Sequence, residues 1–252
     1  MLKARDLTAV QDRTGKIRPD DVLLFCTFRN EDQRLPYFVQ YYRDLGIDHF
    51  LMVDNDSDDG GRDFLADQPD VSLWQTKAGY GAARHGIDWL TYLQGKYAHD
   101  HWALTVDVDE FFVYPFCDSR PIRALADWLD ASEVRSFGAL LLDMYPKGPV
   151  SAQPYQRGDD PFKTACWFDA GNYVMSRNTM LRTLYPQVAQ HVPQHHAAQP
   201  VDTGWPARAH VFRGQTATGP RAEQDPLCEM AAHLCLCQLD PYDAAARVEP
   251  CL

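Results

Sequence analysis

Short apolar segments alternate with amphipathic segments through the first 145 residues, and this alternation restricts the possible folds more than any other feature. The first apolar segment, VLLFCTF, is hydrophobic at all but one position, as expected of a strand with both faces buried. Strands and helices in alternation predict an α/β fold with a mostly parallel sheet that helices cover on both faces. We expect strands at residues 22–28, 49–53, 71–76, 101–114 and 137–145, and helices at residues 31–45, 61–67, 82–97 and 122–129.

Composition divides the chain into three parts. Residues 1–20 are polar and irregular, and they are expected to form a surface lead-in. Residues 21–185 carry the alternating pattern and are expected to form the main domain. Residues 186–252 hold eight prolines and twelve alanines without a sustained period, which predicts a loop-rich C-terminal extension. Because the composition changes so sharply there, we hypothesise that this extension is a diverged or frame-altered C-terminus.

Net charge and targeting signals exclude several classes of protein. The formal net charge of −11 disfavours a general nucleic-acid binder, because such proteins need a basic surface. No apolar run reaches about 18 residues, so no transmembrane segment is predicted, although peripheral membrane contact stays open. The N-terminus lacks the apolar stretch of a secretory signal, and the seven cysteines are an odd, scattered set. Both observations predict a reducing, cytoplasmic setting.

Polar residues follow four of the expected strands at the point where each strand ends. The carboxyl ends of parallel strands share one edge of the sheet, where ligands bind, so these residues are candidates for a common site. In extended backbone, Asp107 and Asp109 of the segment VDVDEF project the same way and repel each other unless a cation lies between them. Their hard oxygens select Mg²⁺ or Mn²⁺; a solvated acidic turn is the alternative. The further candidates are Thr27, Arg29, Glu31, Asp54, Asn55, Lys77 and Arg84.

Three of these candidates have competing interpretations. Asp54 ends the second strand, where its carboxylate is a candidate to bind a nucleobase edge. The surrounding run DNDSDDGG also suits a turn and a helix N-cap, which is the structural alternative. Lys77 and Arg84 flank a glycine pair and are candidates to meet a phosphate or a base. Ordinary surface charge is the alternative for both.

Taken in order, these segments resemble a family 2-type glycosyltransferase of the GT-A fold, a Rossmann-like doubly wound architecture. The resemblance covers about residues 21–182. It rests on motifs that follow one another at matching spacing, including a D-x-D-E-F motif and a segment similar to the family's G-x-ARN-x-G helix start. The motifs are Arg-Asn-Glu at residues 29–31, LGIDHF at 45–50, VDNDSDDG at 53–60, GYGAARHGI at 79–87 and DVDEF at 107–111.

The resemblance implies a metal-dependent transfer of a sugar, with inversion, from a nucleotide-diphosphate donor to a hydroxyl. The donor is expected to be a UDP-sugar, and the acceptor a saccharide, a lipid-linked glycan or a protein, within glycan or polysaccharide biosynthesis. Asp107 and Asp109 would hold Mn²⁺ or Mg²⁺, and Asp107 would also approach the ribose. The transfer needs a general base; Asp143 and Asp169 are the candidates, with a hydrogen-bonded or helix-capping aspartate as the alternative for each. The nucleotide would be lined by Thr27, Arg29, Glu31, Asp54 and Arg84.

Two other functions stay open. A sugar-nucleotide pyrophosphorylase also binds nucleotides on a doubly wound sheet. That class usually has a glycine-rich loop after its first strand, and the segment TFRNE contains no glycine. A catalytically impaired nucleotide-sugar-binding protein is the other alternative. It is motivated by the unusual C-terminal segment and by the lack of a motif that identifies the general base.

Overall fold

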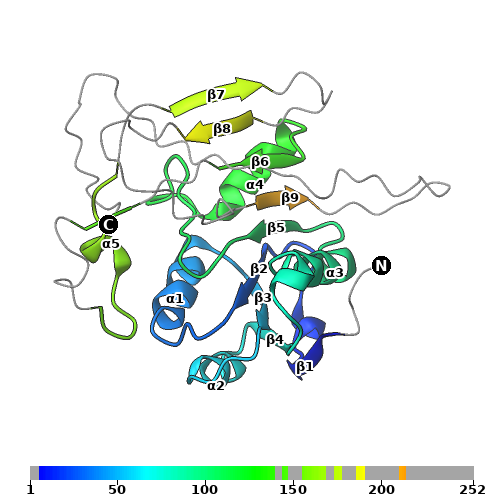
Figure 1. Cartoon of the computed structure of the whole chain (residues 1–252). Coiled ribbons are helices and arrows are strands. Elements are labelled where there is room, and N and C mark those ends of the chain that lie inside the picture. Colours follow the sequence, from blue (N-terminus) through cyan, green and yellow to red (C-terminus); the bar gives the residue numbers. More distant parts are fainter. Residues whose placement is uncertain are drawn as a thin grey trace.

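A seven-stranded sheet forms the centre of the domain (Figure 1). The computed structural model describes residues 6–139, 144–146, 155–168, 173–177, 186–190 and 210–213. The strands of the sheet are β1 (Thr8–Gln11), β2 (Leu23–Phe28), β3 (His49–Asp54), β4 (Val71–Gln75), β5 (Trp102–Thr105), β6 (Ser136–Gly138) and β9 (His210–Arg213). Their order is β1-β4-β3-β2-β5-β9-β6. The four strands β4-β3-β2-β5 pair in parallel, whereas β1, β9 and β6 pair antiparallel. A separate antiparallel pair consists of β7 (Tyr173–Arg177) and β8 (Pro186–Gln190).

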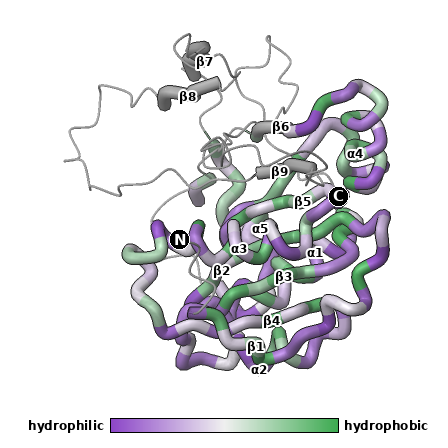
Figure 2. Tube along the Cα trace, turned by 90° about the vertical axis from the view of Figure 1, so that its right-hand side faces the viewer, coloured by the Kyte–Doolittle hydropathy of each residue, from purple (hydrophilic) through white to green (hydrophobic). Residues whose placement is uncertain are grey.

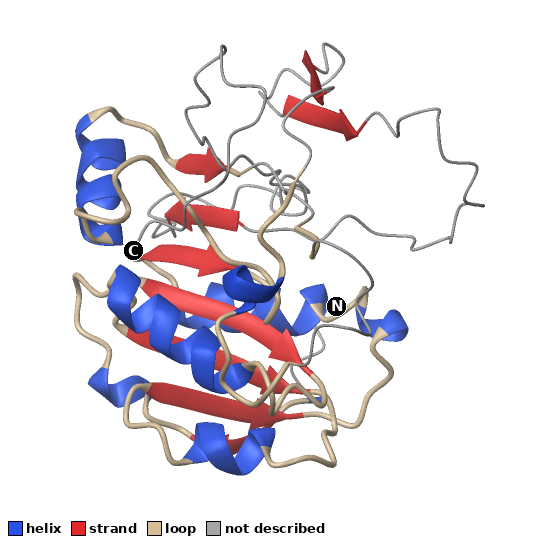
Figure 3. Cartoon of the chain, turned by 90° about the vertical axis from the view of Figure 1, so that its left-hand side faces the viewer, coloured by secondary structure: helices blue, strands red, loops and turns tan. Residues whose placement is uncertain are grey.

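Helices cover both faces of the sheet (Figure 3). They are α1 (Leu35–Leu45), α2 (Gly61–Ala66), α3 (Ile87–Tyr97) and α4 (Ile122–Ala131). The short α5 (Pro161–Thr164) contacts α1 through Phe162, whose ring lies 6.2 Å from that of Tyr41. Alternate residues of β2 point to opposite faces, as the pleat requires. Leu24 and Cys26 pack with residues of α1, α2 and α4, while Leu23 and Phe25 pack with residues of α3. The α/β class predicted from the sequence is therefore confirmed.

The central elements follow directly from their residue patterns. All six residues of β2 and all six of β3 are buried, and the hydrophobic residues lie along these inner strands (Figure 2). Helix α1 buries one stripe of side chains and ends at Gly46, whose φ of 100° is left-handed, a conformation that favours glycine. Burial of each large side chain, such as Phe38, contributes about 1.5–3 kcal/mol. Within the described residues, no helix has the length and apolar character needed to cross a bilayer.

Several predictions of local structure were wrong in part. The expected lead-in contains β1, an edge strand that pairs with β4; its side chains are mostly exposed, so no apolar pattern announced it. The expected strand at 101–114 ends at Thr105, and the chain then turns. Of the expected strand at 137–145, the structure describes β6, which pairs antiparallel with β9. That partner strand comes from the segment expected to be loop-rich.

The strand order creates a switch point between β2 and β5. From β2 the chain builds β3 and β4 on one side, and it then returns to place β5 on the other side of β2. In such sheets, the crevice outside the carboxyl ends of the two strands at the switch point is the usual ligand site. Here those ends lead into the segments that begin at Arg29 and at Val106.

Candidate functional site

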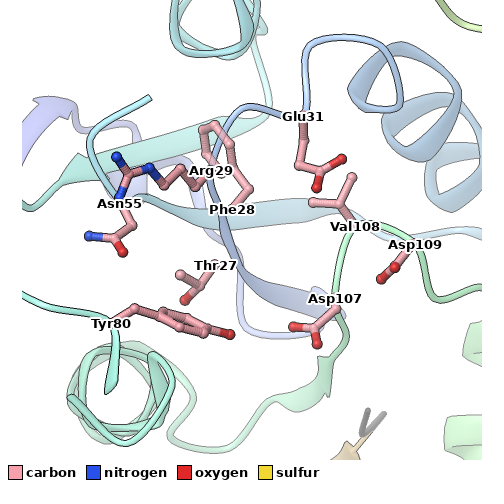
Figure 4. A pocket seen from close by; sticks show the side chains of 9 residues that line it. All are labelled: Thr27, Phe28, Arg29, Glu31, Asn55, Tyr80, Asp107, Val108 and Asp109. Atoms are coloured by element: carbon pink, nitrogen blue, oxygen red, sulfur yellow. The ribbon is translucent and has the colours of Figure 1, made fainter. Parts of the chain in front are cut away.

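A pocket of about 380 Å³ lies at the switch point. Its residues come from four segments that are far apart in the sequence, and each segment follows one of the parallel strands (Figure 4). They meet because parallel strands bring their carboxyl ends to one edge of the sheet. The lining residues are Thr27 and Phe28 at the end of β2, Arg29 and Glu31 after it, Asn55 after β3, Tyr80 after β4, and Asp107, Val108 and Asp109 after β5.

Acidic and basic groups occupy different sides of this pocket. Figure 4 shows Glu31, Asp107 and Asp109 on one side, with Arg29 and Asn55 on the other. Glu31 also accepts a hydrogen bond from Arg34. In the described part of the chain Arg29 is exposed and forms no ion pair, so its guanidinium is available to an anion. The acidic side carries more charge than Arg29 offsets, so an anionic ligand there needs a cation as well.

Asp107 has the most perturbed carboxyl group of the pocket. Burial raises its pKa, and the carboxylates of Asp109 and Glu31 raise it further, to about 6. A bound cation would relieve this repulsion. Mg²⁺ is commonly held by one or two carboxylates together with water and substrate phosphates. Among the described residues no group of three or more His, Cys, Asp or Glu could hold a metal ion, so a role for Asp107 and Asp109 as metal ligands stays a prediction.

The two aspartates reach the pocket from a turn rather than from extended backbone. The N–H of Glu110 donates to the carbonyl of Asp107 over 3.0 Å. Val106 and Val108 are 1% and 4% exposed and anchor the turn in the core. The valines of this alternating segment are buried, as the predicted strand required, but the backbone of the aspartate-rich segment forms a turn and not a strand. Both carboxylates still line one pocket.

Thr27, Asn55 and Tyr80 supply the neutral polar groups. The Oγ1 atom of Thr27 is buried without a hydrogen-bond partner among the described residues. Asn55 donates to the carbonyls of Thr76 and Ala78, which holds the loop after β4 against the pocket. Burial, followed by the charge of Asp107, raises the pKa of Tyr80 to about 12. Its hydroxyl therefore stays protonated, and it points toward Asp107 (Figure 4).

The sequence did not single out Tyr80, Phe28 or Val108. The only signal for Tyr80 was its position between the glycines of the turn after β4. Phe28 and Val108 looked like ordinary core residues, and both are indeed almost fully buried. Their contribution to the pocket wall depends on how neighbouring strands pack, which periodicity does not describe.

Three predicted ligand-binding residues lie outside the pocket lining. Asp54 is fully buried and pairs with Arg62. It also accepts from the N–H of Ser57, as in a turn, but the residue that caps α2 is Gly60, without a side-chain hydrogen bond. Lys77 is exposed, 3.8 Å from a carboxylate oxygen of Asp56. Arg84 donates to Asp88 over 2.7 Å. The structure brings six predicted residues to one pocket: Thr27, Arg29, Glu31, Asn55, Asp107 and Asp109. Roles for Asp54, Lys77 and Arg84 toward a ligand stay predictions.

The two general-base candidates cannot be placed relative to the pocket. Asp143 and Asp169 both lie outside the described residues. Their assignment stays a prediction.

Gly86 packs against the floor of the site. Its φ is +82°, and a Cβ atom there would lie 2.9 Å from Oγ1 of Thr27. We expect Gly86→Ala to destabilise the protein by about 1–3 kcal/mol and to displace Thr27, as measured by urea unfolding. Gly95→Ala is the matched control on α3, because nothing lies within 4 Å of its added Cβ. It should stabilise by about 0.5–1 kcal/mol; equal effects of the two variants would contradict the close approach.

Comparison with known proteins adds one relationship. No protein-family model matches the chain. A glycosyltransferase family 92 protein of Ricinus communis is 26% identical to it over 106 residues, which make up 39% of this chain and 18% of that protein. The chain thus matches less than a fifth of the length of that relative. This similarity supports a glycosyltransferase in general.

Proposed function

We propose that this chain is a metal-dependent glycosyltransferase of the GT-A fold, of the family 2 type. It moves a sugar from a nucleotide-diphosphate donor, expected to be a UDP-sugar, to a hydroxyl acceptor with inversion. The similarity to a family 92 glycosyltransferase supports the sugar-transfer class. One observation carries the finer proposal: three carboxylates face Arg29 and Asn55 across a pocket at the switch point of the sheet.

The two sides of the pocket suit the two ends of a nucleotide. Asp107 and Asp109 would hold Mn²⁺ or Mg²⁺ together with the diphosphate. Such an ion would neutralise the charge that develops on the departing diphosphate. Arg29 supplies a second positive charge, and Asn55 and Thr27 offer polar atoms for the nucleoside. Tyr80 exposes 41% of its surface and forms an aromatic wall beside them.

The transfer itself is a single displacement. The acceptor oxygen bonds to the anomeric carbon as the bond from that carbon to the diphosphate oxygen breaks. A general base takes the acceptor proton, and the nucleoside diphosphate leaves. Asp143 and Asp169 are the proposed bases. One displacement of this kind inverts the anomeric centre.

The test is release of nucleoside diphosphate from a panel of nucleotide sugars with Mn²⁺ and with EDTA. We expect turnover that depends on Mn²⁺, and a fall of about 100-fold or more in Asp109→Ala. Asp109 is exposed, so this variant should keep its fold. Asp127→Ala removes the same charge from the exposed face of α4, and it should behave as the wild type.

Other outcomes would identify the alternatives. Donor binding without turnover would indicate a nucleotide-sugar-binding protein. Formation of a nucleoside triphosphate from a nucleotide sugar and pyrophosphate would indicate a pyrophosphorylase. Turnover that is equal in Mn²⁺ and EDTA would contradict the metal-dependent mechanism.

A further inference from the structure

One buried tyrosine hydroxyl binds the backbone of the acidic turn, which we define as residues 106–112. Tyr42 lies on the inner face of α1 and is fully buried. Its hydroxyl donates to the carbonyl of Glu110 over 2.9 Å and accepts from the N–H of Phe112 over 3.0 Å. A single side chain therefore satisfies backbone groups on both sides of Phe111. Because α1 is packed into the core, this contact fixes the end of the turn relative to the sheet.

A second contact closes the turn on itself. The side chain of Glu110 folds back, and its Oε2 accepts from the N–H of Asp107 over 3.0 Å. Its own N–H donates to the carbonyl of Asp107 over 3.0 Å. Glu110 is only 6% exposed and does not line the pocket. This carboxylate thus differs from Asp107 and Asp109, whose carboxylates line it.

The start of the turn is held separately. The N–H of Val106 donates to the carbonyl of Phe25 on β2 over 3.3 Å. With Tyr42 at the other end, the backbone from Val106 to Phe112 is tied down on both sides of the aspartates. Two neighbouring carboxylates repel each other, so a free turn would let them move apart. A restrained turn keeps them close before any cation arrives.

We infer that Tyr42 and Glu110 are positioning residues, which hold the turn so that Asp107 and Asp109 face the same pocket. The metal-binding consequence rests on the proposed function, whereas the restraint on the turn does not. Ligand groups that are preorganised by such contacts bind more tightly, because less ordering is needed on binding. Burial also keeps the pKa of Tyr42 well above its ordinary value, so its hydroxyl stays a donor.

The test compares Tyr42→Phe with the wild type by two measurements. Hydrogen exchange, followed by mass spectrometry, reports on peptides that cover residues 106–112. Calorimetry reports the affinity for UDP with Mn²⁺ and with EDTA. We expect faster exchange in residues 106–112 but not in β2, and a loss of about tenfold in the Mn²⁺-dependent affinity. UDP affinity in EDTA should not change. A general loss of stability would instead lower the affinity for UDP both in Mn²⁺ and in EDTA.

Tyr114→Phe is the matched control. Tyr114 is also buried, and its hydroxyl donates to the carbonyl of Arg120, away from the turn. Its removal should leave exchange in residues 106–112 and Mn²⁺-dependent affinity as in the wild type. Glu110→Ala gives an independent test should Tyr42→Phe not fold. Glu110→Ala should speed hydrogen exchange in the same peptides. Glu110→Gln keeps an acceptor for the N–H of Asp107, so its exchange rate should lie between those of the wild type and Glu110→Ala.

The outcomes separate this inference from the proposed function. Unchanged exchange in Tyr42→Phe would overturn the inference. If the wild type binds UDP more tightly in Mn²⁺ than in EDTA, faster exchange in the variant without a loss of that Mn²⁺-dependent affinity would overturn it as well. If the wild-type protein binds UDP equally in Mn²⁺ and EDTA, the proposed function is contradicted. Faster exchange in the variant would then still support the restraint of the turn by Tyr42.

Discussion

Asp107→Asn is expected to stabilise the metal-free protein at neutral pH while removing its Mn²⁺-dependent donor binding. Burial and the neighbouring carboxylates raise the pKa of Asp107 to about 6 from its ordinary 3.8. Keeping this group ionised therefore opposes folding at pH 7 by about 3 kcal/mol. Asparagine carries no charge and avoids most of that penalty, so we expect a gain of about 1–3 kcal/mol. The same change removes one proposed metal ligand.

The pH dependence gives this prediction its sign. A carboxyl whose pKa is higher in the folded state than in the unfolded state favours folding at low pH. This advantage is lost as the pH rises through the folded-state pKa. The wild type and Asp107→Asn should therefore have equal free energies of unfolding near pH 4. The variant should become the more stable of the two as the pH rises from about 4 to about 6. Urea unfolding in EDTA at several pH values measures the difference.

Asp109→Asn is the matched control for Asp107→Asn. Because Asp109 is exposed, the free energy of unfolding of Asp109→Asn in EDTA should differ from that of the wild type by less than about 0.5 kcal/mol. Metal binding should also be lost in this variant. Mn²⁺ with UDP should raise the melting temperature of the wild type alone. Retained Mn²⁺-dependent binding in Asp107→Asn would contradict its role as a ligand. A loss of stability at neutral pH would contradict the raised pKa.

Arg62→Ala is expected to destabilise the protein by about 3–5 kcal/mol. Asp54 is fully buried, with Oδ2 accepting from Nε of Arg62 over 2.5 Å and Oδ1 accepting from the N–H of Ser57 over 2.9 Å. Removal of the guanidinium leaves the buried carboxylate without its cation. Combining Arg62→Met with Asp54→Asn should restore part of the stability, because no unpaired charge then remains. Urea unfolding measures each variant.

Arg157→Ala is the control for the loss of an arginine ion pair. Arg157 donates two hydrogen bonds to Asp32, but its side chain is half exposed. Exposed pairs contribute about 0–1 kcal/mol. If Arg62→Ala and Arg157→Ala lower the free energy of unfolding equally, the burial of Asp54 does not determine how much its ion pair with Arg62 stabilises the protein.

Much of the fold could be predicted because its signals are local. Continuous apolar runs identified β2 and β3, and apolar residues at helical spacing identified α1 and α4. Parallel strands bring their carboxyl ends together whatever their side chains are. That rule predicted that Thr27, Arg29, Glu31, Asn55 and the two aspartates of the acidic turn would share a site. The edge strand β1, and β9 between β5 and β6, carried no such local signal and were missed.

The composition of the site depended on contacts that residue order does not reveal. Asp54 and Asp107 both follow buried strand residues, and the sequence made both of them candidates for binding the ligand. The structure separates them, because α2 brings Arg62 to Asp54 while Asp107 lies beside other carboxylates. Tyr42 matched the apolar stripe of α1, and only the packing of that helix shows its hydroxyl on the acidic turn.

The sequence by itself determined the α/β class, the central strands and the edge of the sheet at which polar groups gather. Periodicity and backbone geometry are sufficient for these features, since each depends on near neighbours along the chain or on a general rule of sheets. Only the tertiary structure decided which of the polar groups face the pocket and which are paired inside the protein. Whether a polar group is paired depends on residues distant in sequence, because these come close to it only when the helices pack on the sheet.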